Sequence, residues 1–283
     1  MLDFFEALGD PDALFLRYAL LAGVLASVSL GIIGAYVVTR RISYLGGAIS
    51  HCVLSGIGLG LFLDYAWFHP MYGAVVSALL AALLIGLVSL YARQREDTVI
   101  GALWAVGMAV GILLFAATPG YKDPMSYLFG DILLISPEDL WLVAGLDVLV
   151  AGVGLVFYHK FQAICFDQEF AELRGLHVKV FYLLLLCLTA LTIVLMVRLV
   201  GIVMVVALLT LPAAVAGFFS RKLWQMMLLG TLICAAMIAV GLAVSFSRDL
   251  PTGPVIIVLA GATYLAVIVG SRLWPTKRMK DKG

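Results

Sequence analysis

The sequence predicts an all-α polytopic membrane protein with about nine spanning helices. Of its 283 residues, 64% are apolar and only 12% are charged, whereas an ordinary soluble domain is roughly 45–50% apolar and about 25% charged. The apolar residues form long continuous runs, such as AVVSALLAALLIGLVSLYA. Strands of a membrane β-barrel instead alternate apolar and polar residues over about ten positions. These observations exclude a barrel and a soluble, secreted or nucleic-acid-binding protein.

Nine apolar runs follow one another along the chain, each close to the length of about 20 residues that a spanning helix needs. They cover residues 14–38, 44–63, 71–91, 99–118, 139–158, 179–198, 200–219, 224–246 and 254–273. The sixth and seventh meet at Arg198–Gly201, and we expect two helices there because no membrane needs about 40 residues to cross. We therefore expect a single membrane domain over residues 1–283, embedded over about 14–273.

The basic residues predict which helix ends face the cytoplasm. With the N-terminus outside, most Lys and Arg fall in inward-facing loops or in the C-terminal tail. The exceptions are Arg17, Lys122, Arg198 and Arg248. Because cytoplasmic loops carry an excess of Lys and Arg, we predict an N-out and C-in orientation. Eight helices would break this alternation unless one segment were re-entrant.

The inner loop over about residues 159–178 is too long for a simple turn. Within it, FDQEFAELRG predicts a short surface helix with acidic residues in its first turn and Gly175 at its end. A short polar helix on the cytoplasmic face is a suitable contact for a soluble partner. The alternative is a simple interfacial helix.

Two ionisable residues within the runs are functional candidates, because such groups are costly in lipid. His51 lies in the second run, and a neutral imidazole is a good ligand for zinc and similar metals. The alternative is a histidine that is hydrogen-bonded to a neighbouring helix. Asp147 lies near the middle of the fifth run, where a structural pair with Arg17 or Arg198 is favoured over a role in a polar pathway.

Several other features have mainly structural interpretations. Pro212 falls inside the seventh run and is expected to kink or break that helix. The pairs Gly56–Gly60 and Gly107–Gly111 have the spacing that lets neighbouring helices approach closely. The cysteines form no CxxC pair and are expected to be small buried hydrophobic residues. They are Cys52, Cys165, Cys187 and Cys234.

The chain carries neither a GxxxxGK[ST] phosphate-binding loop nor a GxSxG nucleophile motif. We therefore expect that this chain is not an enzyme and does not hold ATP by itself.

Six ordered segments resemble the permeases of zinc, manganese and iron ABC importers. They are RRISYLGGAISHCVLSGIGLG from Arg40, DTVIG from Asp97, YLFGDILLISPEDL from Tyr127, FDQEFAELRGLHV from Phe166, VGIVMVVALLTLPAAVA from Val200 and SRDLPTGP from Ser247. Their order, their spacing and the total length agree over about residues 14–273. The resemblance implies a type II importer permease in a bacterial inner membrane.

Partners and cargo follow from the same resemblance. Two copies are expected to form the pore, two cytoplasmic ATPase subunits to bind ATP, and an external binding protein to deliver the metal. The transported ion is expected to be zinc, with manganese or iron next, and no permanently bound cofactor is expected.

The resemblance also implies roles for particular residues. His51 matches the family's pathway histidine, but Gly47 stands where the family has Asp. A replacement ligand is then expected from the partner copy, another helix or water, with Cys52 as a weaker contributor. Asp147 and Pro212 are candidates for either the pathway or the structure. The coupling segment is implied at Asp167, Gln168, Glu169, Ala171, Glu172 and Gly175.

Three other classes of protein are alternatives to this one. A siderophore or cobalamin permease has the same general fold, but such chains are usually longer and lack the histidine signature. A secondary carrier often has two matching halves, and no repeat is evident here. An intramembrane enzyme needs convergent catalytic groups in several spans, and this sequence offers only His51 and Asp147.

Overall fold

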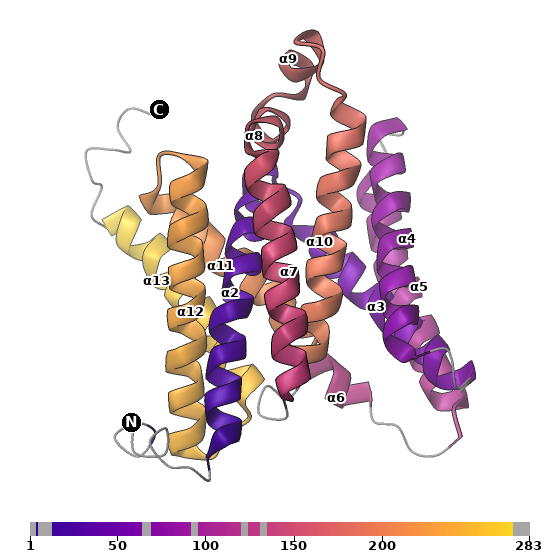
Figure 1. The fold of residues 1–283 in the computed structure, drawn as a ribbon, viewed down its shortest axis with the longest axis vertical. Coiled ribbons are helices and arrows are strands. Elements are labelled where there is room, and N and C mark those ends of the chain that lie inside the picture. Colours follow the sequence, from indigo (N-terminus) through magenta and orange to yellow (C-terminus); the bar gives the residue numbers. More distant parts are fainter. Residues whose placement is uncertain are drawn as a thin grey trace.

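The computed structural model describes residue 4 and residues 13–63, 69–91, 96–119, 124–130 and 135–273. Within these ranges all regular structure is helical. The helices are α2 (Leu14–Arg40), α3 (Ser43–Leu63), α4 (Pro70–Tyr91), α5 (Glu96–Ala117), α6 (Pro124–Phe129), α7 (Pro137–Val156), α8 (Tyr158–Phe166), α9 (Gln168–Leu173), α10 (Val178–Val200), α11 (Ile202–Phe219), α12 (Leu223–Arg248) and α13 (Thr252–Leu273) (Figure 1).

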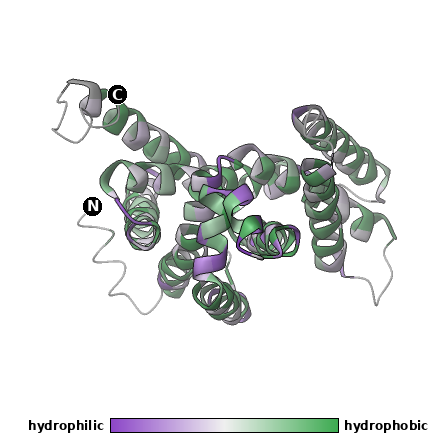
Figure 2. Cartoon of the chain, turned by 90° about the horizontal axis from the view of Figure 1, so that it is seen from above, coloured by the Kyte–Doolittle hydropathy of each residue, from purple (hydrophilic) through white to green (hydrophobic). Residues whose placement is uncertain are grey.

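Nine of the described helices are long and apolar enough to cross a membrane, which confirms the number predicted from the sequence. They are α2, α3, α4, α5, α7, α10, α11, α12 and α13. Viewed from above, the helices are hydrophobic along most of their outward sides (Figure 2). An apolar exterior of this kind is expected where lipid is the solvent.

The short helices lie at the two ends of the bundle. Figure 1 shows α6 at one end, and α8 and α9 at the other. In the predicted orientation the α6 end is outside and the α8–α9 end is inside. The loop with Arg93 and Arg95 and the basic tail after Leu273, both used in that prediction, lie outside the described residues.

The spanning helices pack in two neighbouring groups. Helix α3 packs against α4 and α5, whereas α2 packs against α12 and α7. Helix α10 contacts both α4 and α3, and it also contacts α11. In Figure 1 the α3–α5 group stands on one side of the bundle and α12 and α13 on the other.

Glycines allow the closest approaches within the α3–α5 group. A Cβ added at Gly56 would lie 2.2 Å from the carbonyl oxygen of Gly73, and one added at Gly60 would lie 2.5 Å from the Cα of Pro70. A Cβ at Gly107 would lie 2.8 Å from the Sγ of Cys52. These contacts confirm the close helix packing that the glycine spacing predicts.

The break between α10 and α11 confirms that the sixth and seventh runs are separate helices. Gly201 lies between them with a φ of 80° and a ψ of 162°, a conformation that is essentially restricted to glycine. A Cβ there would lie 2.3 Å from the carbonyl carbon of Phe129. The end of α6 therefore packs directly on the α10–α11 turn.

Pro212 does not break its helix. Helix α11 continues on both sides of it, so of the two expected outcomes, a kink or a break, the break does not occur. A proline lacks the N–H that would bond the carbonyl of Leu208, but membrane helices tolerate this loss when neighbouring groups compensate. Pro212 is buried among the neighbouring helices.

All four cysteines are free thiols, and all except Cys187 are buried. The expectation of small buried hydrophobic residues is confirmed for those three. In α8, burial raises the pKa of the Cys165 thiol to about 12, so this group is a neutral packing residue.

Candidate functional site

His51 lies in α3, held between its own helix and α5. Its Nδ1 is 2.9 Å from the carbonyl oxygen of Gly47, one helical turn earlier. A carbonyl only accepts hydrogen bonds, so Nδ1 carries the proton and donates it. The second ring nitrogen, Nε2, then keeps its lone pair in the neutral imidazole and is free to bind a metal.

The indole of Trp104 in α5 covers one side of this imidazole. The two ring centroids are 4.8 Å apart, and the ring planes are inclined by 32°. The His51 side chain is half-buried, and the Trp104 side chain is 38% exposed. The site is therefore packed against α5 but still open on one side. Sequence reasoning missed Trp104, although a tryptophan within an apolar run was a visible signal.

The space beside the Gly47 backbone is already filled. A Cβ added there would lie 2.5 Å from Cζ3 and 2.6 Å from Cη2 of Trp104, which is closer than real Cβ contacts permit. The indole therefore occupies the place that a side chain at position 47 would need.

Cys52 follows His51 in the chain but contacts a different part of α5. Its Sγ donates to the carbonyl of Leu103 at 3.4 Å, and the residue is buried. The thiol is packed against the α5 backbone near Gly107.

Asp147 is held by α2. One carboxylate oxygen accepts hydrogen bonds from the backbone N–H of Ser29, at 3.1 Å, and from its hydroxyl. The other oxygen, Oδ2, is buried without a hydrogen-bond partner. Arg198, one of the two expected partners, instead forms an ion pair with Asp139 at 2.9 Å. Of the two partners left open for Asp147, Arg198 is therefore engaged elsewhere. Ser29 was missed because nothing in the sequence indicates which helix packs beside α7.

The described residues hold no group of three or more His, Cys, Asp or Glu side chains that could bind a metal together. His51 and Asp147 belong to different packing groups, the first to α3–α5 and the second to α2–α7. One described copy therefore supplies a single imidazole rather than a complete metal site.

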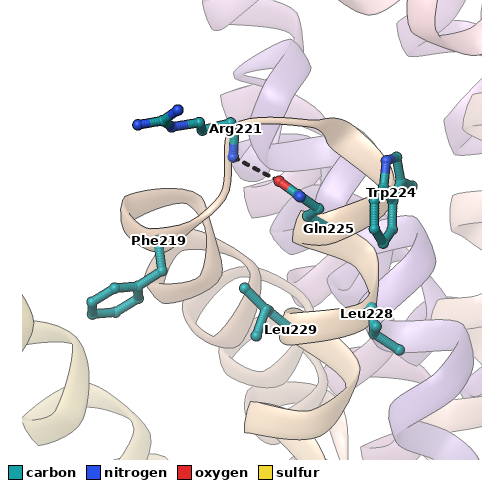
Figure 3. Close-up of a pocket in the computed structure, with 6 residues that line it drawn as sticks. All are labelled: Phe219, Arg221, Trp224, Gln225, Leu228 and Leu229. Atoms are coloured by element: carbon teal, nitrogen blue, oxygen red, sulfur yellow. Dashed lines mark hydrogen bonds between the residues drawn. The ribbon is translucent and has the colours of Figure 1, made fainter. Parts of the chain in front are cut away.

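Two surface cavities of about 380 Å³ lie elsewhere. One is at the α11–α12 turn, where the backbone N–H of Arg221 donates to Gln225 at 3.1 Å (Figure 3). It is lined by Phe219, Arg221, Trp224, Gln225, Leu228 and Leu229. The other is lined by Phe129, Gly130, Leu250, Pro251, Thr252, Gly253 and Pro254. Neither lining includes a carboxylate, imidazole or thiol, so neither cavity has the ligands of a transition-metal site.

The residues predicted for coupling lie in α9 and at its two ends, and α9 projects with α8 from one end of the bundle (Figure 1). Asp167 caps α9 by accepting the N–H of Phe170 at 2.9 Å. Gly175 follows α9 with a φ of 78°, which explains why the helix ends there. Ala171 is buried, so it supports the segment from within.

Exposed apolar side chains on this projection were not predicted. Phe166 is 67% exposed, Phe170 53% and Leu173 87%, and Glu169 and Glu172 are exposed among them. These residues lie outside the spanning helices. An exposed apolar patch rimmed by charges is typical of a protein contact.

Comparisons with known proteins agree with this architecture. Residues 12–271 match the ABC 3 transport family. A probable metal transport system membrane protein of Chlamydia pneumoniae is 38% identical over 257 residues, covering 89% of this chain and 88% of that protein. The manganese import system permease protein ScaB of Streptococcus parasanguinis is 32% identical over 251 residues, covering 89% of each.

A solved structure shares the fold. A chain of PsaBC from Streptococcus pneumoniae, in complex with Fab, superposes with a TM-score of 0.83 at 28% identity, covering 94% of both chains.

The fold and these matches define a multi-pass membrane permease of the metal ABC-importer class. The chain belongs to the ABC 3 transport family, which confirms the resemblance found in the sequence.

Proposed function

We propose that this chain is the membrane-spanning subunit of an ATP-driven importer of divalent transition-metal ions, with His51 as a ligand in the pathway. The observation that carries this proposal is the imidazole within α3, whose Nδ1 is bound to Gly47 so that Nε2 is free. An ion cannot cross apolar protein unless ligands offset its lost hydration. His51 supplies such a ligand within a spanning helix.

Zinc is the proposed cargo, ahead of manganese and iron. A neutral nitrogen ligand without a neighbouring carboxylate suits zinc better than manganese, which prefers oxygen ligands. ScaB, at 32% identity, is named as a manganese permease, so manganese is the main competitor.

A second copy would complete the site. Zinc usually takes four ligands, and one copy offers a single imidazole here. Helices α5 and α13 are the least buried of the described spans. Only 22% of the residues in the apolar stretch of α5 are buried, and 17% of those in α13. Each exposes three small residues at intervals of one helical turn, which allow close helix contact: Gly101, Ala105 and Ala109 in α5, and Ala262, Ala266 and Gly270 in α13. We propose that these faces meet the partner copy.

We propose that the two ends of the bundle contact the remaining partners. The α8–α9 projection would fit into the cytoplasmic ATPase subunit, with Phe170 and Leu173 as its apolar contacts. The opposite end, with α6, would receive the external metal-binding protein. This arrangement places the protein in a bacterial inner membrane with its N-terminus outside.

The test is ATP-driven uptake in vesicles that contain the permease with its ATPase subunits, with zinc, manganese and iron in competition. We expect His51→Ala to lower zinc uptake sharply at unchanged membrane abundance. His69→Asn is the matched control, because His69 is exposed, lies outside the spanning helices and accepts the N–H of Met71 at the start of α4. Wild-type uptake by His51→Ala would show that the imidazole is only a packing group.

A further inference from the structure

The indole of Trp104 makes two separate contacts with the region around His51. It stacks on the imidazole at 4.8 Å between centroids, and its Cζ3 and Cη2 atoms fill the space beside Gly47. The far end of the ring is therefore turned towards α3, although the side chain keeps 38% of its surface exposed.

The first contact restricts the orientation of the imidazole. The hydrogen bond from Nδ1 to Gly47 fixes the tautomer and one direction of the ring. The stacked indole restricts rotation of the same ring about its Cβ–Cγ bond. Groups that orient a metal-binding histidine in this way strongly affect metal affinity. Nε2 is then presented in one direction, away from the Gly47 carbonyl.

The second contact excludes other ligands. Positions 47 and 51 lie one turn apart on the same face of α3, so a side chain at 47 would stand next to the imidazole. The indole already occupies that place, and even a methyl group would meet it at 2.5 Å. The space beside Gly47 is therefore closed to an oxygen ligand as long as the indole stays in place.

The backbone holds the indole in this position. The Sγ of Cys52 donates to the carbonyl of Leu103, and Gly107 brings the α5 backbone against Cys52. Both contacts fix the part of α5 on either side of Trp104 close to α3. The indole is thus attached to a helix segment that packs closely against α3, and not to a loop.

We propose that Trp104 is a positioning and specificity-determining residue of the His51 site. It orients the imidazole and fills the space beside Gly47, where a water molecule would otherwise reach the bound ion, and so favours zinc over manganese, which prefers oxygen ligands. This inference rests on the proposed function, since it assigns the metal preference of the same site. The recognised ligand is a divalent cation that prefers nitrogen to carboxylate oxygen.

A set of paired substitutions tests both effects of the indole. Gly47→Ala and Gly47→Asp are each made in the wild-type background and together with Trp104→Ala. Zinc and manganese uptake are measured in vesicles with the ATPase subunits, at matched membrane abundance. The quantity compared is the ratio of zinc uptake to manganese uptake, which a purely structural defect would not change.

We expect Trp104→Ala to lower zinc uptake by about 10-fold, in the range seen when an orienting partner of a metal ligand is lost. Trp104→Phe, which still stacks, should retain most of the uptake. Gly47→Asp alone should displace the indole and impair uptake as Gly47→Ala does. In the Trp104→Ala background, Gly47→Asp should shift the uptake ratio towards manganese by about 10-fold relative to Gly47→Ala.

Trp104→Leu provides a check against misfolding, because it keeps an apolar side chain at this position but cannot stack. The proposal is overturned if Trp104→Leu and the Asp-containing double variant both keep the wild-type uptake ratio. If uptake still requires His51 in that case, the proposed function stands and only the role of Trp104 is lost. If the wild-type complex shows no ATP-driven metal uptake, the proposed function itself fails.

Discussion

The carboxylate of Asp147 is the most deeply placed acidic group of the described spans, and a single residue holds it. Ser29 donates both its backbone N–H and its hydroxyl to the same carboxylate oxygen. This pair links α7 to α2 near the middle of both helices. Removing the donors of a buried carboxylate costs more free energy than a typical hydrogen bond contributes, because water cannot replace those donors.

We therefore expect Ser29→Ala to destabilise the protein by about 1–3 kcal/mol, because it removes one of the two hydrogen bonds to this buried oxygen while the backbone N–H remains. Thermal unfolding of the purified protein measures this loss. Ser27→Ala is the matched control: Ser27 is also buried in α2, but its hydroxyl bonds to Val24 of its own helix. Equal stability of the two variants would show that the Ser29–Asp147 bond contributes little.

Among the helical elements, α9 is the clearest candidate for a contact with a soluble subunit. It is only six residues long, so it depends on its Asp167 cap and on packing of Ala171 against the structure below. The turn after it needs a positive φ at Gly175. Proline fixes φ near −65°, so Gly175→Pro should disrupt this projection while the spanning helices remain intact.

A charge at the tip of the projection should uncouple the ATPase from transport. We expect Leu173→Asp to weaken binding of the ATPase subunit by about 10-fold or more, because a charge at a central apolar contact loses its water when the interface forms. Co-purification and ATP-driven uptake measure the effect. Leu173→Met keeps the apolar contact and should behave as the wild type. Normal ATPase binding by Leu173→Asp would exclude Leu173 from the interface.

For the whole molecule, the nine spans place the α6 end and the α8–α9 end on opposite sides of the membrane. Met125 in α6 is 54% exposed, and Glu172 in α9 is exposed. We expect Met125→Cys to react with a membrane-impermeant thiol reagent from outside, and Glu172→Cys to react only after permeabilisation. Labelling of both positions from one side would contradict the nine-span topology.

Assembly of two copies is the second property that belongs to the whole molecule. A bulky residue on a close-packed helix face should keep the copies apart. We expect Ala109→Phe and Ala266→Phe to reduce co-purification of two differently tagged copies. Leu84→Phe in α4 is the control, because Leu84 is 50% exposed on a helix outside the proposed interface. Unchanged co-purification in both variants would place the interface elsewhere.

Local sequence features were sufficient to predict much of the fold. Apolar runs of the required length predicted the nine spans, including the division between the sixth and seventh runs near Gly201. Glycine pairs in α3 and α5 predicted close packing, because a missing side chain permits it whichever helix is the neighbour. These features depend on residues near one another in the chain, so a single sequence reveals them.

The site was predicted less completely, because its partners come from distant parts of the chain. His51 was recognisable as an imidazole in an apolar run, but its neighbour Trp104 lies on another helix, and so does Ser29, the partner of Asp147. Pro212 looked like a helix break because local sequence does not show that neighbouring helices support the backbone.

The sequence alone therefore determined that the chain is embedded in lipid, how many spans it has, which family it belongs to and which histidine is the candidate ligand. All of these follow from composition and short motifs. The tertiary structure alone decided that an indole fills the space beside Gly47, that Asp147 bonds to Ser29 and that Phe170 and Leu173 project from the bundle. These facts depend on which helix faces which, and that choice is made by packing between segments far apart in the chain.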